Sequence, residues 1–184
     1  MNALTLSHKF ISQYVKPGDL VIDATAGKGK DTLMLCKLVG NTGKVIAMDI
    51  QKAAILQTKA LLESEGMDHV AELFIDSHSN MQKYAEAGSV NCIVFNFGWL
   101  PGGDHNIFTH KETSIEAIEQ GLKLLKSGGI MSLTVYYGRN NGYEERDAIL
   151  DYLKTIDDTK YTVMVLDFAN RKNDPPFPVF IIKD

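Results

Sequence analysis

Short apolar runs rich in β-branched residues alternate with stretches of helical spacing along most of the chain. We expect the runs to form strands at 19–24, 44–49, 70–75, 90–96 and 130–137. Apolar residues three and four positions apart predict helices at 4–15, 31–39, 51–65, 79–87 and 113–126. Strands that alternate with helices form βαβ units, so the pattern predicts a parallel sheet with helices on both faces. We expect the first helix to pack on the edge of this sheet.

The last third of the chain departs from this pattern. A helix at 143–156 is followed by apolar runs at 161–169 and 177–183, without a helix between them. The connection contains two adjacent prolines, which exclude it from a central strand. Because it is too short for a crossover, the two strands must pair antiparallel. The sequence therefore predicts an α/β, Rossmann-like fold of seven mostly parallel strands with a C-terminal antiparallel hairpin, in one domain spanning 1–184.

A glycine loop, DATAGKGKDT at 23–32, joins the first strand to the next helix. Gly27 and Gly29 let the backbone turn tightly and approach a ligand closely. Asp31 and Thr32 suit the cap or the first turn of a helix. The GxG spacing alone also fits an ordinary tight turn. Its place at the carboxyl end of the first strand, where open α/β sheets bind ligands, favours a cofactor loop.

The loop matches neither of two familiar phosphate-binding patterns. A dinucleotide fingerprint requires a third glycine where this chain has Thr32, and the sequence contains no GxxxxGK[ST] motif. Asp49 ends the second strand, where a carboxylate can accept both hydroxyls of a ribose. That role fits NAD and S-adenosylmethionine equally. The terminal hairpin separates them, because it resembles the seventh-strand insertion of class I methyltransferases, which nicotinamide-binding domains lack.

Charged side chains in the glycine loop favour different ligands. Asp23 and Asp31 suit a cationic ligand with a free amino group, whereas Lys28 and Lys30 suit a phosphate. We give the topology more weight than the two lysines, which we expect to face solvent. S-adenosylmethionine is therefore the favoured cofactor. An NAD-dependent oxidoreductase and a non-catalytic interaction module are the alternatives.

Asp76, Ser77 and His78 follow the third strand, at the same edge of the predicted sheet. We expect this segment to supply contacts to an adenine ring. Taken alone, His78 is better explained as a surface loop histidine.

The loop after the fourth strand carries candidate catalytic groups. Asn96 is the last residue of an apolar strand, and its side-chain oxygen can accept a hydrogen bond from a substrate amine. Asp104 offers a carboxylate to a cationic amine. A loop rich in glycine and proline at the carboxyl end of a central strand is a usual place for catalysis in this architecture. We therefore assign substrate contacts to Trp99, Pro101, Gly102, Gly103 and His105.

The fifth strand ends at the same edge with Tyr136, Tyr137 and Arg139. Aromatic and arginine side chains there can stack on a nucleotide or bind its phosphate. Successive strand residues face opposite sides, so one tyrosine faces the cleft and the sequence leaves open which. We take Tyr137 as the candidate catalytic residue. Arg171 and Lys172 form either a basic rim or part of a solvated hairpin loop.

The composition of the chain limits the kinds of partner and site that the protein can have. Asp and Glu outnumber Lys and Arg by 23 to 19, for a net charge of −4, so nucleic acid cannot be held by bulk charge. Any such partner must be held by a local patch. Cys36 and Cys92 are predicted as reduced core residues, and the spacing of Asp104, His105 and His110 matches no metal site. We expect neither a signal peptide nor a membrane span, and hence a soluble cytoplasmic protein.

Together these segments resemble the bacterial "putative rRNA methylase" family of class I methyltransferases. NFGWLPGGD is a specific motif, whereas the glycine loop is shared widely among class I methyltransferases. The segments that carry the resemblance are DATAGKGKDT at 23–32, MDIQ at 48–51, DSH at 76–78, NFGWLPGGD at 96–104, VYYG at 135–138 and NDPPF at 173–177.

The resemblance implies N-methylation with S-adenosylmethionine as cofactor. Its tRNA-modifying members convert 5-aminomethyl-2-thiouridine to the 5-methylaminomethyl form at wobble position 34, which implies the anticodon region of tRNA as partner. Ribosomal RNA and small-molecule amines are the alternatives. The family often has Asn and His where this chain has Lys28 and Lys30, and lysine cannot accept hydrogen bonds. The cofactor contacts that the resemblance implies are position 28, Asp31, Asp49, Gln51, Ser77 and His78.

The chemistry of N-methylation fits these residues. Methyl transfer needs a neutral amine, whereas an aminomethyl group is mostly protonated at neutral pH. We expect Asn96 and backbone carbonyls of 100–103 to orient the nitrogen lone pair, and Asp104 to hold or deprotonate the ammonium. A chain of this length leaves little room for an RNA platform beyond the catalytic core, which favours a homodimer.

Overall fold

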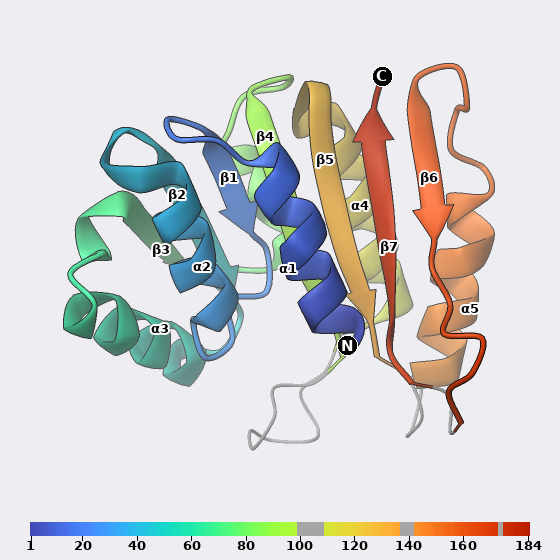
Figure 1. Cartoon of the computed structure of the whole chain (residues 1–184), viewed down its shortest axis with the longest axis horizontal. Coiled ribbons are helices and arrows are strands. Elements are labelled where there is room, and N and C mark those ends of the chain that lie inside the picture. The colour runs from blue at the N-terminus through green and yellow to red at the C-terminus, as the bar shows by residue number, and fades with distance from the viewer. Residues whose placement is uncertain (99–108, 137–141, 173–174) are drawn as a thin grey trace.

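The computed structural model describes the chain apart from residues 99–108, 137–141 and 173–174 (Figure 1). Its centre is a seven-stranded sheet with the strand order β3-β2-β1-β4-β5-β7-β6. The strands are β1 (Leu20–Asp23), β2 (Lys44–Asp49), β3 (Ala71–Ile75), β4 (Val90–Phe97), β5 (Leu125–Val135), β6 (Tyr161–Val165) and β7 (Phe177–Lys183). The α-helices are α1 (Ala3–Tyr14), α2 (Lys30–Val39), α3 (Lys52–Ser64), α4 (Lys111–Leu124) and α5 (Gly142–Leu153). The short 3-10 helices are η1 (Gly40–Thr42), η2 (Asp68–Val70) and η3 (His78–Lys83).

Strand pairing confirms the predicted fold class. The pairings among β1 to β5 are parallel, whereas β7 lies antiparallel between β5 and β6. In β1, Val21 lies opposite Cys92 of β4, and Asp23 lies opposite Val94. The strand order thus reverses between β1 and β4, and the carboxyl ends of these strands lie side by side. Open α/β sheets bind their ligands at such a reversal.

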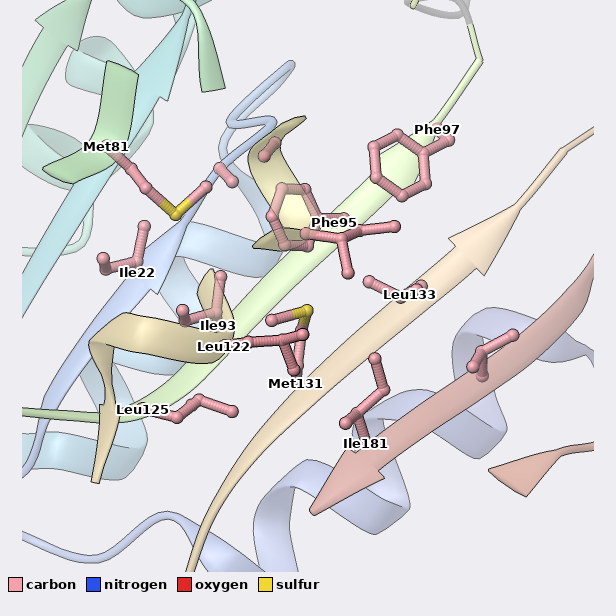
Figure 2. Packing of buried hydrophobic residues seen from close by; sticks show 14 of the residues in the cluster. Ile22, Met81, Ile93, Phe95, Phe97, Leu122, Leu125, Met131, Leu133 and Ile181 are labelled. Carbon is pink, nitrogen blue, oxygen red and sulfur yellow. The ribbon is translucent and has the colours of Figure 1, made fainter. Parts of the chain in front are cut away.

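Helices cover both faces of the sheet (Figure 1). Alternate residues of a strand face opposite sides, so Val21 joins the apolar cluster of α1, α2 and α3. Its neighbour Ile22 joins the cluster of α4 and α5. Figure 2 shows this second cluster, in which Phe95 and Met131 of adjacent strands lie with Leu122 of α4. Burial on both faces holds the strands in place and so positions the loops at their carboxyl ends.

Two details of the predicted fold are wrong. α1 does not lie on the edge of the sheet but packs across β5 and β7, where Phe10 stacks on Phe180 with ring centroids 3.9 Å apart. The terminal hairpin extends the sheet beyond β5, so the strands under α1 are interior strands. The helix predicted at 79–87 is instead the short η3, whose N-cap is Ser77.

The structure also bears on the two cysteines and on membrane-spanning helices. Cys36 and Cys92 are buried free thiols, as predicted. In the part of the chain that the structure describes, no helix is long and apolar enough to cross a membrane.

Candidate functional site

A cavity of about 570 Å³ opens at the carboxyl ends of the parallel strands. Its walls come from α1 and from the segments that follow β1, β2, β3, β4 and β5. A cavity of this size holds a ligand as large as a nucleoside. Asn96, the predicted acceptor for a substrate amine, lies in its wall. The predicted cofactor residues that line the cavity are Gly27, Lys28, Asp31, Asp49, Gln51, Ser77 and His78.

The glycine loop has a backbone conformation that favours glycine. Gly27 has a φ of 54° and Gly29 a φ of 79°, and Gly29 is the N-cap of α2. A Cβ atom at Gly29 would lie 2.8 Å from the Cα atom of Thr58 on α3. The Thr58 hydroxyl donates to the carbonyl oxygen of Gly27 over 3.3 Å. Close packing against α3 therefore fixes the loop that faces the cavity.

Replacing Gly29 with alanine should destabilise the protein more than backbone strain alone. A left-handed backbone costs a residue with a Cβ atom about 1–2 kcal/mol, and here the new methyl group also meets the Thr58 backbone. Gly66→Ala is the matched control, because Gly66 has a φ of 67° and no atom within 4 Å of an added Cβ. Urea unfolding of both variants measures the difference. Equal losses of unfolding free energy would contradict the packing argument.

Asp49 contacts the glycine loop from the end of β2. Its Oδ2 atom accepts from the backbone N–H of Gly27 over 3.0 Å, and its Oδ1 atom accepts from the backbone N–H of Gln51 over 2.9 Å. Burial raises the pKa of Asp49, and these hydrogen bonds oppose the rise. A carboxylate has about four lone-pair sites, so each oxygen keeps capacity for a ligand hydroxyl. Asp49 fits the ribose contact that the sequence predicts.

Asp23 belongs to the same loop but does not line the cavity. Its fully buried carboxylate accepts from the Thr32 hydroxyl over 2.6 Å and from the Thr25 backbone N–H over 3.2 Å. Burial raises the pKa of Asp23 to about 7, and repulsion by Asp31 adds to the rise. The carboxylate braces the first turn of α2, which explains why the predicted cofactor contact of Asp23 is not open to the cavity.

Asp31 joins three elements at the cavity wall. Its Oδ1 atom lies 2.7 Å from Nε2 of His8 on α1, and its Oδ2 atom accepts from Nδ2 of Asn96 over 2.7 Å. The Asn96 backbone N–H donates to the Thr25 hydroxyl over 2.8 Å. Oδ1 of Asn96 is buried and has no hydrogen-bond partner among the described residues. Because an unpaired buried carbonyl oxygen costs free energy, this arrangement suits a ligand that donates to Asn96.

His78 is not the surface loop histidine that it resembles when taken alone. It is 8% exposed, and its ring lies edge-on to Phe95 and Phe97, with centroid distances of 6.2 and 6.0 Å. Burial lowers the pKa of His78 to about 4, so the imidazole is neutral at physiological pH. Its Nε2 atom is buried without a hydrogen-bond partner in the described part of the chain. His78 thus lines the cavity with a neutral ring and an unsatisfied nitrogen, which fits the predicted adenine contact.

Tyr136 is the tyrosine that the described residues place in the cavity. It follows β5 directly, and its backbone N–H donates to the carbonyl oxygen of Phe97 over 3.2 Å. Burial raises the pKa of the Tyr136 hydroxyl, and the charge of Asp31 raises it further. Tyr136 also packs closely on Gly98, where an added Cβ would lie 3.1 Å from the Tyr136 Cβ. A phenol beside Asp31 and Asn96 adds an aromatic wall to the site.

The remaining predicted site residues lie outside the described residues, and their roles stay predictions. They are Trp99, Pro101, Gly102, Gly103, Asp104, His105, Tyr137 and Arg139. Arg171 and Lys172 are described and exposed, and an Arg171 N–H donates to the carbonyl oxygen of Met1 over 3.2 Å. The hairpin loop is thereby joined to the start of α1.

Sequence reasoning missed two contributors to the site. His8 reaches Asp31 from a helix whose packing on the sheet is set by distant strands. Glu145 on α5 is buried, and its carboxylate accepts from the Thr109 hydroxyl over 2.9 Å. That hydroxyl accepts in turn from the backbone N–H of Gly98 over 2.9 Å. Glu145 thus ties the two flanks of the predicted substrate loop together, a role that no local pattern signals.

Comparison with curated proteins and families gives consistent matches. A family model described as "Putative rRNA methylase" matches residues 45–182. The chloroplastic tRNA (mnm(5)s(2)U34)-methyltransferase of Arabidopsis thaliana is 39% identical over 156 residues, which are 80% of this chain and 57% of that protein. This chain spans about half the length of the curated relatives that it matches.

Solved structures match over the whole chain. A putative rRNA methylase from Clostridium thermocellum is 42% identical with a TM-score of 0.97, over 100% of this chain and 98% of that one. A putative methyltransferase from Streptococcus mutans, solved in complex with SAH, is 35% identical with a TM-score of 0.90, over 100% and 98% of the two chains. The family model covers most of the chain, and the fold is that of class I methyltransferases. The chain therefore belongs to the "Putative rRNA methylase" family.

Proposed function

We propose that this protein methylates the exocyclic amine of a wobble uridine in tRNA, converting 5-aminomethyl-2-thiouridine to 5-methylaminomethyl-2-thiouridine at position 34. It is a methyltransferase, and its cofactor is S-adenosylmethionine. The observation that carries the proposal is Oδ1 of Asn96, a buried oxygen of a residue in the cavity wall that lacks a hydrogen-bond partner among the described residues. Such an oxygen suits a hydrogen bond from an N–H of the amine that receives the methyl group. The 39% identity to the tRNA methyltransferase of Arabidopsis thaliana supports tRNA as the substrate.

The cavity fits the cofactor through groups that still have hydrogen-bonding capacity. Asp49 would hold the ribose hydroxyls, and His78 would contact the adenine through its unsatisfied Nε2 atom. Asp31 would face the cationic amino group of the methionine part. When bound, S-adenosylmethionine supplies a methyl group that bonds to the acceptor nitrogen as its bond to sulfur breaks, leaving S-adenosylhomocysteine.

Asn96 is the residue that orients the acceptor amine. The aminomethyl group must first lose a proton, because a protonated nitrogen has no lone pair to form the new bond. By accepting one N–H of the neutral amine, Oδ1 of Asn96 restricts the direction of the lone pair. Such positioning supplies a large part of enzymatic rate enhancement. Asp104, outside the described residues, is our proposed acceptor for the proton.

Labelled methyl transfer to bulk RNA tests this function. Bulk tRNA and ribosomal RNA are prepared from cells that lack the activity, and each is incubated with the protein and methyl-labelled S-adenosylmethionine. We expect label in the tRNA fraction. Label confined to ribosomal RNA would overturn the tRNA proposal and leave the methyltransferase assignment standing.

Exposed lysines at the cavity mouth should contribute to tRNA binding. Lys28 and Lys30 are exposed and line the cavity, in a chain whose net charge of −4 leaves attraction to RNA to local groups. We expect Lys28→Ala combined with Lys30→Ala to weaken tRNA binding. The slope of the logarithm of the binding constant against the logarithm of the salt concentration should become shallower by roughly one per lysine. Filter binding across a salt series measures both effects.

Lys123→Ala is the matched control for this double variant. Lys123 is also exposed but lies near the end of α4 and does not line the cavity. An identical salt dependence for the wild type and the double variant would contradict a phosphate contact at Lys28 and Lys30.

A further inference from the structure

A chain of hydrogen bonds enters the cavity wall from His8, a residue to which the mechanism above gives no role. Nε2 of His8 lies 2.7 Å from Oδ1 of Asp31, and Oδ2 of Asp31 lies 2.7 Å from Nδ2 of Asn96. The three residues come from α1, α2 and β4. Asp31 therefore connects the first helix with Asn96, the residue proposed above to orient the amine that receives the methyl group.

The carboxylate of Asp31 decides which way the Asn96 amide points. A carboxylate only accepts hydrogen bonds, so Asn96 must direct its N–H group at Asp31. The carbonyl oxygen on the other branch of the amide is then directed elsewhere, and it is the atom without a partner among the described residues. A rotated amide would place a carbonyl oxygen against a carboxylate oxygen and would be repelled. The productive orientation of Asn96 thus depends on where Asp31 is held.

His8 holds Asp31 through the second oxygen of its carboxylate. Asp31 is 8% exposed, and the Asp31–His8 contact occupies the oxygen that Asn96 does not use. The His8 side chain is 32% exposed, whereas the apolar anchoring of α1 comes from Ile11 and Val15, which are buried. Removal of the imidazole should therefore free Asp31 without unfolding the helix.

We infer that His8 is a positioning residue for methyl transfer, which acts through Asp31 to keep Oδ1 of Asn96 directed at the acceptor nitrogen. The inference rests on the proposed function for the identity of the acceptor. Both the Nε2–H tautomer and the protonated imidazole donate from Nε2 to Asp31. Positioning by His8 requires only this N–H, so a neutral side chain that donates from the same place can replace the imidazole.

Two substitutions at His8 separate positioning from a structural role. His8→Leu removes the donor, and His8→Gln keeps an N–H near the place of Nε2. We expect His8→Leu to lower kcat about tenfold or more, with a smaller change in KM for tRNA. Its thermal unfolding temperature should fall only modestly, because one oxygen of the buried Asp31 loses its partner while the fold stays intact. We expect His8→Gln to restore most of kcat. His69→Leu is the matched control, because His69 is an exposed histidine whose Nε2 lies 3.2 Å from Oδ1 of Asn41, outside the cavity wall. A loss of kcat that His8→Gln does not restore would overturn the inference.

A second readout decides the inference without any RNA substrate. The side-chain amide signals of Asn96 are assigned in ¹⁵N-labelled protein bound to SAH, by their disappearance in Asn96→Ala. We expect these signals to shift in His8→Leu and to keep their wild-type position in His8→Gln and His69→Leu. Unchanged Asn96 signals in His8→Leu would overturn the role of His8. A wild-type protein that fails to methylate 5-aminomethyl-2-thiouridine would instead overturn the proposed function, and the amide signals would still decide the inference.

Discussion

Replacing Asn96 with alanine lowers kcat for tRNA methylation by about 100-fold or more, with a much smaller change in the dissociation constant of SAH. The reason is that Oδ1 of Asn96 has no hydrogen-bond partner among the described residues. We therefore expect it to accept a hydrogen bond from the amine that receives the methyl group. The substitution leaves the proposed cofactor contacts of Asp49 and His78 in place, and Asp31, which would face the amino group of the cofactor, loses only its hydrogen bond from Asn96. Single-turnover methyl transfer and calorimetric titration with SAH measure the two effects separately.

The same strand supplies a matched control for this variant. Asn91 also lies on β4, but its side chain donates to Asp19 and accepts from the backbone N–H of Leu20, at the opposite end of the sheet. Asn91→Ala should reduce stability and leave kcat near the wild-type value. If Asn96→Ala kept full turnover, or if both variants lost the same activity, the assignment of Asn96 to the acceptor amine would be wrong.

Replacing Asp49 with alanine weakens SAH binding by about 100-fold or more. Each hydrogen bond to a charged group contributes about 1.5–3 kcal/mol, and loss of two from the ribose hydroxyls is worth at least about 3 kcal/mol, or two factors of ten. The backbone N–H of Gly27 also loses its acceptor, which loosens the glycine loop and adds to the effect. Calorimetric titration of SAH into the variant measures the loss.

Asp157 offers a matched control for Asp49. Its Oδ1 atom accepts from the backbone N–H of Thr159 over 3.0 Å, two residues onward, just as Asp49 accepts from Gln51, but in an exposed turn outside the cavity wall. Asp157→Ala should leave the SAH dissociation constant unchanged. An Asp49→Ala protein that bound SAH with wild-type affinity would contradict the ribose contact.

Local pattern predicted the strands well and the packing of α1 poorly. The apolar run at 44–49 coincides with β2, because a buried parallel strand needs continuous apolar residues and its ends are marked by polar ones. The apolar face of α1 showed that the helix packs on the sheet, but not on which strands. That choice depends on β7 inserting between β5 and β6, a pairing that connects segments far apart in the chain.

In the candidate site too, the sequence predicts which segments meet but not how distant elements bury each side chain. Gly27, Asp31 and Asp49 reach the cavity because the ends of parallel strands meet at one edge, which the sequence predicts. Asp23 does not line the cavity, because it lies on the side of β1 that α2 covers. There its carboxylate accepts a hydrogen bond from the Thr32 hydroxyl. The burial of His78 comes from the aromatic residues of β4, which lie distant in sequence.

The central claim is tested most directly by identifying the methylated nucleoside. tRNA that carries 5-aminomethyl-2-thiouridine at position 34 is incubated with the protein and methyl-labelled S-adenosylmethionine, then digested to nucleosides and analysed by mass spectrometry. We predict that the label appears in 5-methylaminomethyl-2-thiouridine, and that tRNA with an unmodified wobble uridine takes up none. Label in any other nucleoside, or equal labelling of the unmodified tRNA, would contradict the account.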